Sequence, residues 1–441
     1  MFAARLLAAL LAAAFLFVTP ARAVTLLRDA GIEHALGQLA EPVLRAAGLN
    51  PGSVRILVVD DTSLNAFIVD TQHVFIHSGM IMKVDSAKAL QAVIAHEAAH
   101  IAGGHISRRL GNMRAARTAT ALGAVLAVAT GAATGRGDAV AGVMLGTQSS
   151  IMGNFMGHTR AEESSADISS VRYLTRAGID PRGAVEVQEI FRGQEALGAR
   201  RQDAYVRTHP LTSDRLRRLR GLVAASGMPE DNDATADYWF GRAKGKLTAF
   251  LRAPAWTLRR LDRSVTPDIA QMREAVARHR QSDLAGAMHA IDAAIAARPR
   301  DAFYRDLKGE ILLESRRADV AVKVYANARS LAPRNPQILG GLGRAQLAAG
   351  QYSAALKTLE EARGRDWRDA RLLRDLSVAY ARTGNNGMAS EATAQRYALQ
   401  GRLEDAAIHA RRAIGLLPRG SAPWRRAQDV LAEAERAEKQ R

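Results

Sequence analysis

The spacing of hydrophobic residues predicts a helix, a small sheet and a second helix in the first 105 residues. Between residues 24 and 50 the apolar positions recur at helical spacing, at Leu26, Ile32, Leu36, Leu39, Val43 and Leu44. Short apolar runs at 54–59, 65–69 and 74–76 predict three strands, with a polar turn at 70–72 between the last two. A second helical pattern covers residues 86–105.

Two later segments are apolar without a clear strand pattern. Residues 119–152 are rich in Ala, Gly, Val and Leu, and a Gly-containing break divides them into halves too short to cross a membrane. We expect two closely packed small-residue helices, and the alternative is a flap or membrane-touching loop over the active site. Residues 238–261 mix Trp and Phe with Arg and Lys. They fit a helix packed between two domains better than a helix on a membrane surface.

From residue 267 onward the pattern repeats every 34 residues. Residues of the same kind recur at this spacing in three series: Pro299 and Pro333; Asp301, Asn335 and Asp369; Ala287, Ala321, Ala355 and Ala389. A 34-residue helix-turn-helix period with small residues at fixed positions is the tetratricopeptide signature. We predict four repeats, at 267–300, 301–334, 335–368 and 369–400, with a last helical pair or cap at 402–418. Such arrays bind other proteins and carry no chemistry of their own.

These elements predict an α+β, mainly α fold: a first domain with a small β-sheet, followed by an α-solenoid. The predicted boundaries are 1–23 signal peptide, 24–225 first domain, 226–266 connecting segment with a basic-aromatic helix, 267–418 repeats and 419–441 helical tail. The leader is predicted from Arg5, the apolar stretch 6–18 and Ala21-Arg22-Ala23, which fits a small-x-small cleavage site. An uncleaved anchor is the alternative.

Composition narrows the chemistry. The 441 residues carry a net charge of +17, but the basic residues are scattered and interleaved with acids, so we expect no nucleic-acid partner. There is no cysteine. A disulfide framework is therefore excluded, and any metal site must use histidine and carboxylate ligands.

The helix at 86–105 contains the pattern His-Glu-x-x-His at residues 96–100. Two histidines four apart project from one face of a helix, which suits one zinc ion, and Glu97 can reach a metal-bound water as general base. The alternative is a helix with two unrelated histidines. His105 is one residue too early for the longer metzincin pattern. If the helix continues, it points about 140° away from His100, so we expect it to be structural.

A catalytic zinc needs a third protein ligand. Glu163 and Asp167 are four residues apart, so on a helix they share a face, with Glu163 placed to bind the metal and Asp167 to orient a neighbouring ligand. An acidic pair of this kind is otherwise a solvated helix face. The segment 174–181, Leu-Thr-Arg-Ala-Gly-Ile-Asp-Pro, adds a further specific pattern.

Together these motifs resemble the M48 family of HExxH metallopeptidases over about residues 25–220. The resemblance also includes Arg28-Asp29, Arg160 before Glu163, and His209-Pro210 with Arg215. It implies one zinc ion per chain bound by His96, His100 and Glu163, with Glu97 as general base. It further implies a proton-donor role for Asp167. The family usually has Gly where this chain has Ala99, a change that touches neither ligand nor base.

Two further segments are candidates for substrate contact and control. Asn65-Ala66-Phe67 is predicted to be an edge strand beside the metal helix that hydrogen-bonds an extended substrate backbone. An ordinary sheet strand is the alternative. His209 precedes Pro210 and is predicted on an extended turn before a helix that starts near Ser213. We expect it to gate activity, either by taking the fourth metal position or by donating a hydrogen bond in the reaction; a surface or packing role is the alternative.

The predicted function is zinc endopeptidase action on misfolded or stalled envelope proteins. The leader predicts secretion, to the periplasm in a Gram-negative cell. The repeats are expected to recruit unfolded or misassembled clients or an outer-membrane barrel assembly machine, and peripheral membrane contact is allowed by the aromatic segment. The alternative function is a chaperone or scaffold for outer-membrane assembly whose protease activity is mostly latent.

Overall fold

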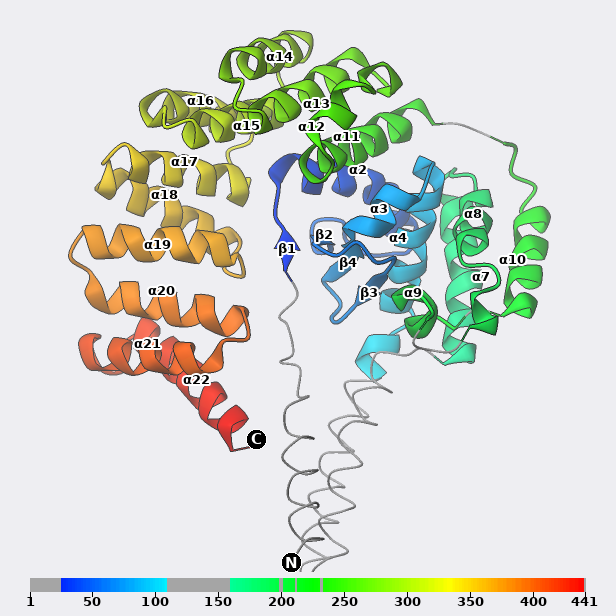
Figure 1. The fold of residues 1–441 in the computed structure, drawn as a ribbon. Coiled ribbons are helices and arrows are strands. Elements are labelled where there is room, and N and C mark those ends of the chain that lie inside the picture. The colour runs from blue at the N-terminus through cyan, green and yellow to red at the C-terminus, as the bar shows by residue number, and fades with distance from the viewer. Residues whose placement is uncertain (1–24, 109–158, 198–200, 211, 231–232, 440–441) are drawn as a thin grey trace, which may run out of the picture. The chain divides into compact units, whose positions relative to one another are not determined.

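The computed structural model describes residues 25–108, 159–197, 201–210, 212–230 and 233–439 (Figure 1). The predicted leader at 1–23 and the small-residue segment at 119–152 lie outside these ranges. The described chain forms two compact units, residues 26–349 and residues 350–441. The mainly α fold with a small sheet and helical repeats is confirmed.

The sheet has four strands in the order β1-β2-β4-β3: β1 Leu26–Leu27, β2 Arg55–Val59, β4 His73–His77 and β3 Ala66–Ile68. β2 and β4 are parallel, and the two outer pairs are antiparallel. The expectation of a helix through Leu26 is wrong. Leu26 and Leu27 pair with Val59 and Val58, and the helix begins only at Ala30, because the Asp29 side chain caps it by accepting from the Ile32 amide.

Helices surround this sheet on the catalytic side of the first unit. They are α2 Ala30–Ala46, α3 Ser78–Lys83, α4 Ala87–Ala102, α7 Arg160–Arg176, α8 Arg182–Ile190, α9 Ala204–Thr208 and α10 Ser213–Ala225. α4 is the central helix: almost every position on it is buried, and it packs against α2, α7 and α8. The Ser86 hydroxyl caps α4, and Gln91 ties it to the carbonyl of Leu39. Because α4 is packed on several sides, the side chains of residues 96–100 on this helix are held in fixed positions.

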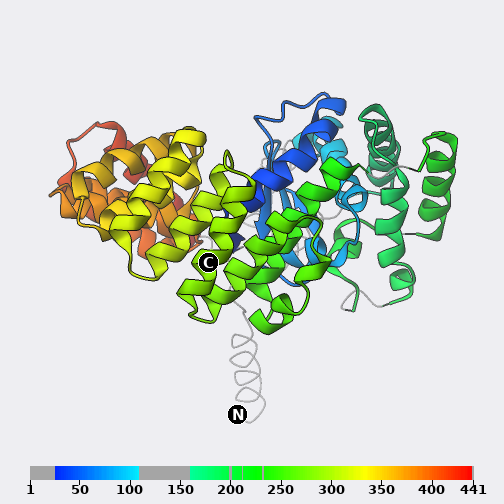
Figure 2. The same ribbon diagram turned by 90° about the horizontal axis from the view of Figure 1, so that it is seen from above.

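α11 Ala234–Leu251 continues this unit toward the repeats, followed by α12 Pro254–Leu258 and the short helix η2 Leu261–Arg263. α11 packs against α2 and α4 and also against α13 Pro267–Arg280. Figure 2 shows α11 lying alongside α2. The aromatic segment thus packs between helices of one compact unit, whereas the prediction was a helix packed between two domains. Among the described residues, none of the helices has the length and apolarity required to cross a membrane.

The repeats continue as α14 Leu284–Ala297, α15 Ala302–Glu314, α16 Ala318–Leu331 and α17 Pro336–Ala348 in the first unit, and α18 Tyr352–Arg365, α19 Ala370–Arg382, α20 Asn386–Leu399, α21 Leu403–Leu416 and α22 Ala422–Glu438 in the second. Asp301, Asn335 and Asp369, the recurring polar series, are helix N-caps. The recurring alanines at 287, 321 and 355 are fully buried, and Ala389 is partly buried. Where a helical pair or cap was expected at 402–418, the structure has one helix, α21.

A set of buried and half-buried charges joins α2, α11 and α15, and we call it the junction cluster: Asp29, Lys246, Arg242, Asp301 and Asp306. Lys246 lies 2.7 Å from the Asp29 carboxylate, and Arg242 donates to Asp301 at 2.9 Å. Burial raises the pKa of Asp306 to about 7 despite the nearby Lys246 charge. The first repeats therefore pack on the catalytic part of this unit through closed ion pairs as well as apolar contacts.

Candidate metal centre

α4 supplies both histidines of the HExxH pattern to one point. The Nε2 atoms of His96 and His100 lie 3.1 Å apart, one helical turn from each other. His96 is 5% exposed, and His100 and Glu97 are fully buried. The i, i+4 spacing on a straight, well-packed helix is sufficient to produce this arrangement, because both side chains leave the same face.

α7 brings the third group from far along the chain. This helix starts with a capping box, in which Thr159 accepts from the Glu162 amide and Glu162 reaches back to the Thr159 amide. Glu163 follows in the first turn and is fully buried where α7 packs on α4. Its carboxylate oxygens lie 3.4 Å from His96 Nε2 and 3.3 Å from His100 Nε2.

His209 closes the cluster from the turn between α9 and α10. It is fully buried, at the C-cap of α9 directly before Pro210, and α10 begins at Ser213 as predicted. Its Nδ1 lies 3.0 Å from Glu163, and its Nε2 lies 3.2 Å from the carbonyl oxygen of Ala66 and 3.4 Å from Glu97. This placement excludes the surface alternative for His209.

The donor set fits a metal ion. One ligand atom from each of His96, His100, Glu163 and His209 can be chosen so that all lie within 4.8 Å of one another. A tetrahedral ion with bonds of about 2.0–2.1 Å separates its ligand atoms by roughly 3.3–3.4 Å. The three separations among the predicted ligands, 3.1, 3.4 and 3.3 Å, are close to that value. Imidazole and carboxylate donors without thiolate are compatible with zinc.

The electrostatics of the cluster also favour a cation. Burial disfavours a charged imidazole at His96, yet the carboxylates of Glu163 and Asp167 outweigh it and raise the pKa of His96 to about 10. Burial and the neighbouring imidazoles lower the pKa of His100. A positive charge at this point is therefore stabilised, and a metal ion can take the place of the proton.

Asp167 and Arg215 support the cluster from behind. Asp167 lies 3.3 Å from His96 Nδ1, the ring nitrogen that faces away from His100. Arg215, on α10 and 4% exposed, contacts Asp167 at 2.8 Å and Glu163 at 2.6 Å. Burial raises the pKa of Asp167, but hydrogen bonds from Arg215 and His96 outweigh it and hold this pKa below its usual value. The lowered pKa favours the carboxylate form of Asp167 beside His96 Nδ1.

His105 is a site residue that the sequence argument placed wrongly. The helix does not continue: α4 ends at Ala102, and Gly104 adopts a left-handed φ of +67°. The chain turns back, and His105 Nδ1 lies 2.8 Å from His100 Nδ1. A Cβ at Gly103 would be 2.9 Å from the His105 ring. The Gly103-Gly104 pair was the available signal, because two glycines commonly end a helix.

β3 is an edge strand of the sheet and packs against α4. Because Asn65 O accepts from the His77 amide, the next pair, Ala66 and Ile76, is a non-hydrogen-bonded pair, and the Ala66 backbone groups point away from β4. Asn65 precedes the strand, and its side chain accepts from Thr208 at 3.3 Å. Phe67 lies on the opposite face of the sheet, stacked on Phe75. The Ala66 carbonyl is in contact with His209.

The sequence is similar to two known protein families and to several bacterial proteases. Peptidase family M48 matches residues 31–223, and a tetratricopeptide repeat family matches residues 312–377. The beta-barrel assembly-enhancing protease of Escherichia coli (strain K12) is 26% identical over 361 residues, 79% of this chain and 72% of that protein. The protein of the same name from Yersinia pestis is 24% identical over 394 residues, 85% and 76% of the two chains. Metalloprotease LoiP of Escherichia coli (strain K12) is 26% identical over 218 residues, 48% and 75%.

Proposed function

We propose that this chain, a metallopeptidase with a peptidase family M48 domain at residues 31–223 followed by tetratricopeptide repeats, is a zinc-dependent endopeptidase of the cell envelope that degrades misfolded or stalled exported proteins. The observation that carries the proposal is the convergence of His96, His100 and Glu163 with Glu97 beside them. We assign the first three as ligands of one zinc ion per chain. We propose His209 as a fourth, displaceable ligand.

Zinc at this point would polarise a peptide carbonyl and lower the pKa of a bound water. The protein's own groups do the rest. Glu97 follows His96 on α4 and is fully buried, so its carboxylate is held in place to take a proton from the attacking water. Asp167 holds the ring of His96, and Arg215 holds the carboxylate of Glu163. This geometry favours an orienting role for Asp167 over the proton-donor role that the family resemblance implies.

His209 supports a latent resting state. Its ring contacts Glu163, Glu97 and the outward carbonyl of Ala66 at the same time. An extended substrate that added to β3 would use that carbonyl as an acceptor, so substrate and His209 compete for it. Displacement of His209 would free both the fourth metal position and the edge strand. In this proposal Ala66 contacts the substrate. Asn65 instead holds Thr208 in place through a hydrogen bond, and Phe67 stabilises the sheet by stacking on Phe75.

Substrate class and location are proposed from the relatives and the repeats. The relatives are named for enhancing β-barrel assembly. The leader predicted at residues 1–23 is consistent with the periplasm of a Gram-negative cell. Backbone recognition at an edge strand reads little sequence, which suits unfolded chains. We assign the repeats to recruiting such clients or a barrel assembly machine. The enclosed His209 also favours the second candidate, a scaffold for assembly with mostly latent activity.

Casein cleavage by the wild type and by Glu97→Gln tests the proposal. Glu97 is assigned as base and not as ligand, so the variant should keep zinc and its fold while losing hydrolysis by on the order of a thousandfold. Glu186→Gln, which makes the same change on α8, is the matched control and should cleave like wild type. Substantial cleavage by Glu97→Gln would remove the mechanism, and absence of cleavage by wild type would favour the scaffold.

His209→Ala tests latency separately. If His209 blocks the site, the variant should keep its zinc and cleave casein roughly several-fold faster than wild type. The reason is that a larger fraction of the molecules would have an open metal site. A decrease in turnover would instead assign His209 to stabilising the reaction intermediate. Turnover equal to wild type between about pH 5 and 8 would leave His209 as a packing residue.

A further inference from the structure

A cavity of about 620 Å³ lies between α11, α12, η2 and α13, and it shares no lining residue with the candidate metal centre. We call it the basic cavity. Its lining contains five cationic side chains, Lys244, Arg252, Arg260, Arg263 and Arg273, against the two acids Asp85 and Asp237. The volume is within the range of small-molecule sites.

Arg273 is the informative residue of this cavity. It is 6% exposed, and its Nη1 donates to the carbonyl of Arg260 at 2.8 Å and to the hydroxyl of Ser264 at 2.5 Å. Both acceptors are neutral, its buried Nε has no hydrogen-bond partner, and no ion pair joins it to an acid within the ranges that the structure describes. Burial lowers its pKa, with partial compensation from the charge of Asp262. A guanidinium stays charged in proteins, so this buried charge lacks a neutralising contact.

The fold holds Arg273 in place. A Cβ at Gly245 on α11 would lie 3.1 Å from Arg273 Cδ, so the glycine leaves room for the arginine stem. Arg260 stacks over the Trp256 ring at 4.6 Å. Arg252 and Arg263 are exposed at the rim, and neither forms an ion pair in the described part of the chain. Lys244 lies 3.4 Å from Asp85, whereas the guanidinium groups of Arg252, Arg263 and Arg273 face the same space without an ion pair in the described part of the chain.

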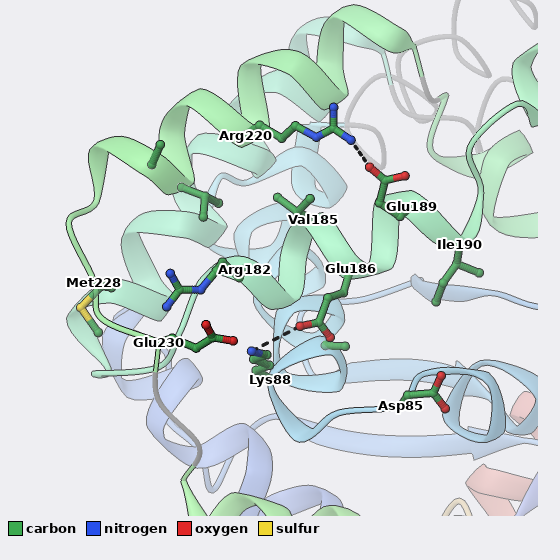
Figure 3. A pocket seen from close by; sticks show the side chains of 13 residues that line it. Asp85, Lys88, Arg182, Val185, Glu186, Glu189, Ile190, Arg220, Met228 and Glu230 are labelled. Atoms are coloured by element: carbon green, nitrogen blue, oxygen red, sulfur yellow. Dashed lines mark hydrogen bonds and ion pairs between the residues drawn. The ribbon is translucent and has the colours of Figure 1, made fainter.

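A second cavity provides an internal comparison. It measures about 770 Å³ and lies between the start of α4, α8 and α10 (Figure 3). We call it the paired cavity, because its cations contact acids: Lys88 lies 3.4 Å from Glu186, and Arg220 pairs with Glu189. Two cavities of this unit are thus lined by charged side chains. In the basic cavity the cationic side chains outnumber the acidic ones, whereas in the paired cavity they do not.

We propose that the basic cavity binds a phosphate group, either of a free phosphate compound or of an anionic lipid headgroup. The guanidinium fork matches phosphate oxygens in geometry, and a phosphate beside the Arg273 side chain would supply the neutralisation that the protein lacks. Arg252 and Arg263 would add charge at the entrance. This site is separate from the peptidase chemistry and does not depend on the proposed function.

The test uses the full chain and pyrophosphate as the probe, measured by titration calorimetry. Arg252→Gln with Arg263→Gln removes two exposed cations from the basic cavity, so folding should be preserved. Arg192→Gln with Arg220→Gln is the control: it removes the same charge from two exposed arginines that both pair with Glu189. We expect saturable binding by wild type, at least about tenfold weaker binding by the first variant, and a change of under about twofold in the control. Arg273→Met should abolish binding.

Vesicles of phosphatidylglycerol, with phosphatidylcholine vesicles as reference, identify the source of the phosphate group. Binding to phosphatidylglycerol vesicles that the cavity variant loses, without pyrophosphate binding, would assign a lipid headgroup. Pyrophosphate binding alone would assign a soluble compound. Equal loss in the cavity variant and the control would show that net charge alone is responsible and would overturn the site. Failure of wild type to bind either probe would overturn it as well.

Discussion

The candidate metal centre and the junction cluster both bury charged side chains in one unit of the chain, but they arrange them differently. In the junction cluster each cation faces its own carboxylate, Lys246 with Asp29 and Arg242 with Asp301. In the metal centre two imidazoles and a carboxylate face one shared point at separations of 3.1–3.4 Å. Ion pairs between neighbouring helices hold those helices together. Several ligand atoms that face one point instead form a binding site for a metal ion.

The largest effect is expected from a substitution in the candidate metal centre. Glu163→Ala removes its carboxylate, so the protein should lose most of its zinc and cleave casein on the order of a thousandfold more slowly. Metal content by mass spectrometry and casein hydrolysis measure both. Glu162→Ala, one residue earlier, is the matched control: it loses a cap contact and should keep the metal. Full zinc occupancy in Glu163→Ala would remove this residue from the ligand set.

The next effect breaks the pairwise cluster. Lys246→Met removes the buried cation beside the half-buried Asp29, which should cost roughly 1–3 kcal/mol of stability. Thermal unfolding should show a clear decrease in melting temperature, while zinc per folded chain stays unchanged. Adding Asp29→Asn removes the orphaned charge and should restore part of the loss, since asparagine also caps a helix. An unchanged melting temperature in Lys246→Met would contradict the structural role of this pair.

A smaller effect concerns pH. Burial raises the pKa of Asp306 to about 7 in the folded protein, above its ordinary value of 3.8, with Lys246 opposing the shift and Asp29 and Glu310 adding to it. The stability that Asp306 contributes is therefore fully present below about pH 4 and is lost as the pH rises to about 7. Asp306→Asn removes this dependence, so its melting temperature relative to wild type should increase between pH 4 and 8, by the equivalent of a few kcal/mol at most. A constant difference across that range would contradict the raised pKa.

The smallest expected effect lies outside both clusters, in a neutral cap. Asn335 accepts from the amides of Gln337 and Ile338 at the start of α17. Asn335→Ala should cost about 1 kcal/mol, or about 2 °C in melting temperature, without altering zinc or cleavage. Arg334→Ala, an exposed neighbour, should have no measurable effect. If the two variants unfold alike, the cap does not contribute.

Local features of the fold and of the site could be read from the sequence. His96 and His100 share a face because a helix repeats every 3.6 residues, and the 34-residue series of Asp301, Asn335 and Asp369 marks helix starts because each caps the residues that follow it. The strand near residue 66 and the helix from Ser213 were also predicted within a residue or two. Each of these depends on atoms a few positions apart in the chain.

Other features depend on packing between segments that are distant in the sequence. The 3.3 Å approach of Glu163 to His100 needs α7 against α4, and the contact of His209 with Ala66 joins residues 143 positions apart. β4 lies between β2 and β3, and the first repeats pack on α2, which no local pattern indicates. The sequence by itself determined which groups could bind a metal and where several of the helices begin, such as the helix from Ser213. Tertiary structure decided which of them meet, because that depends on the summed packing of many side chains and not on the period of any one element.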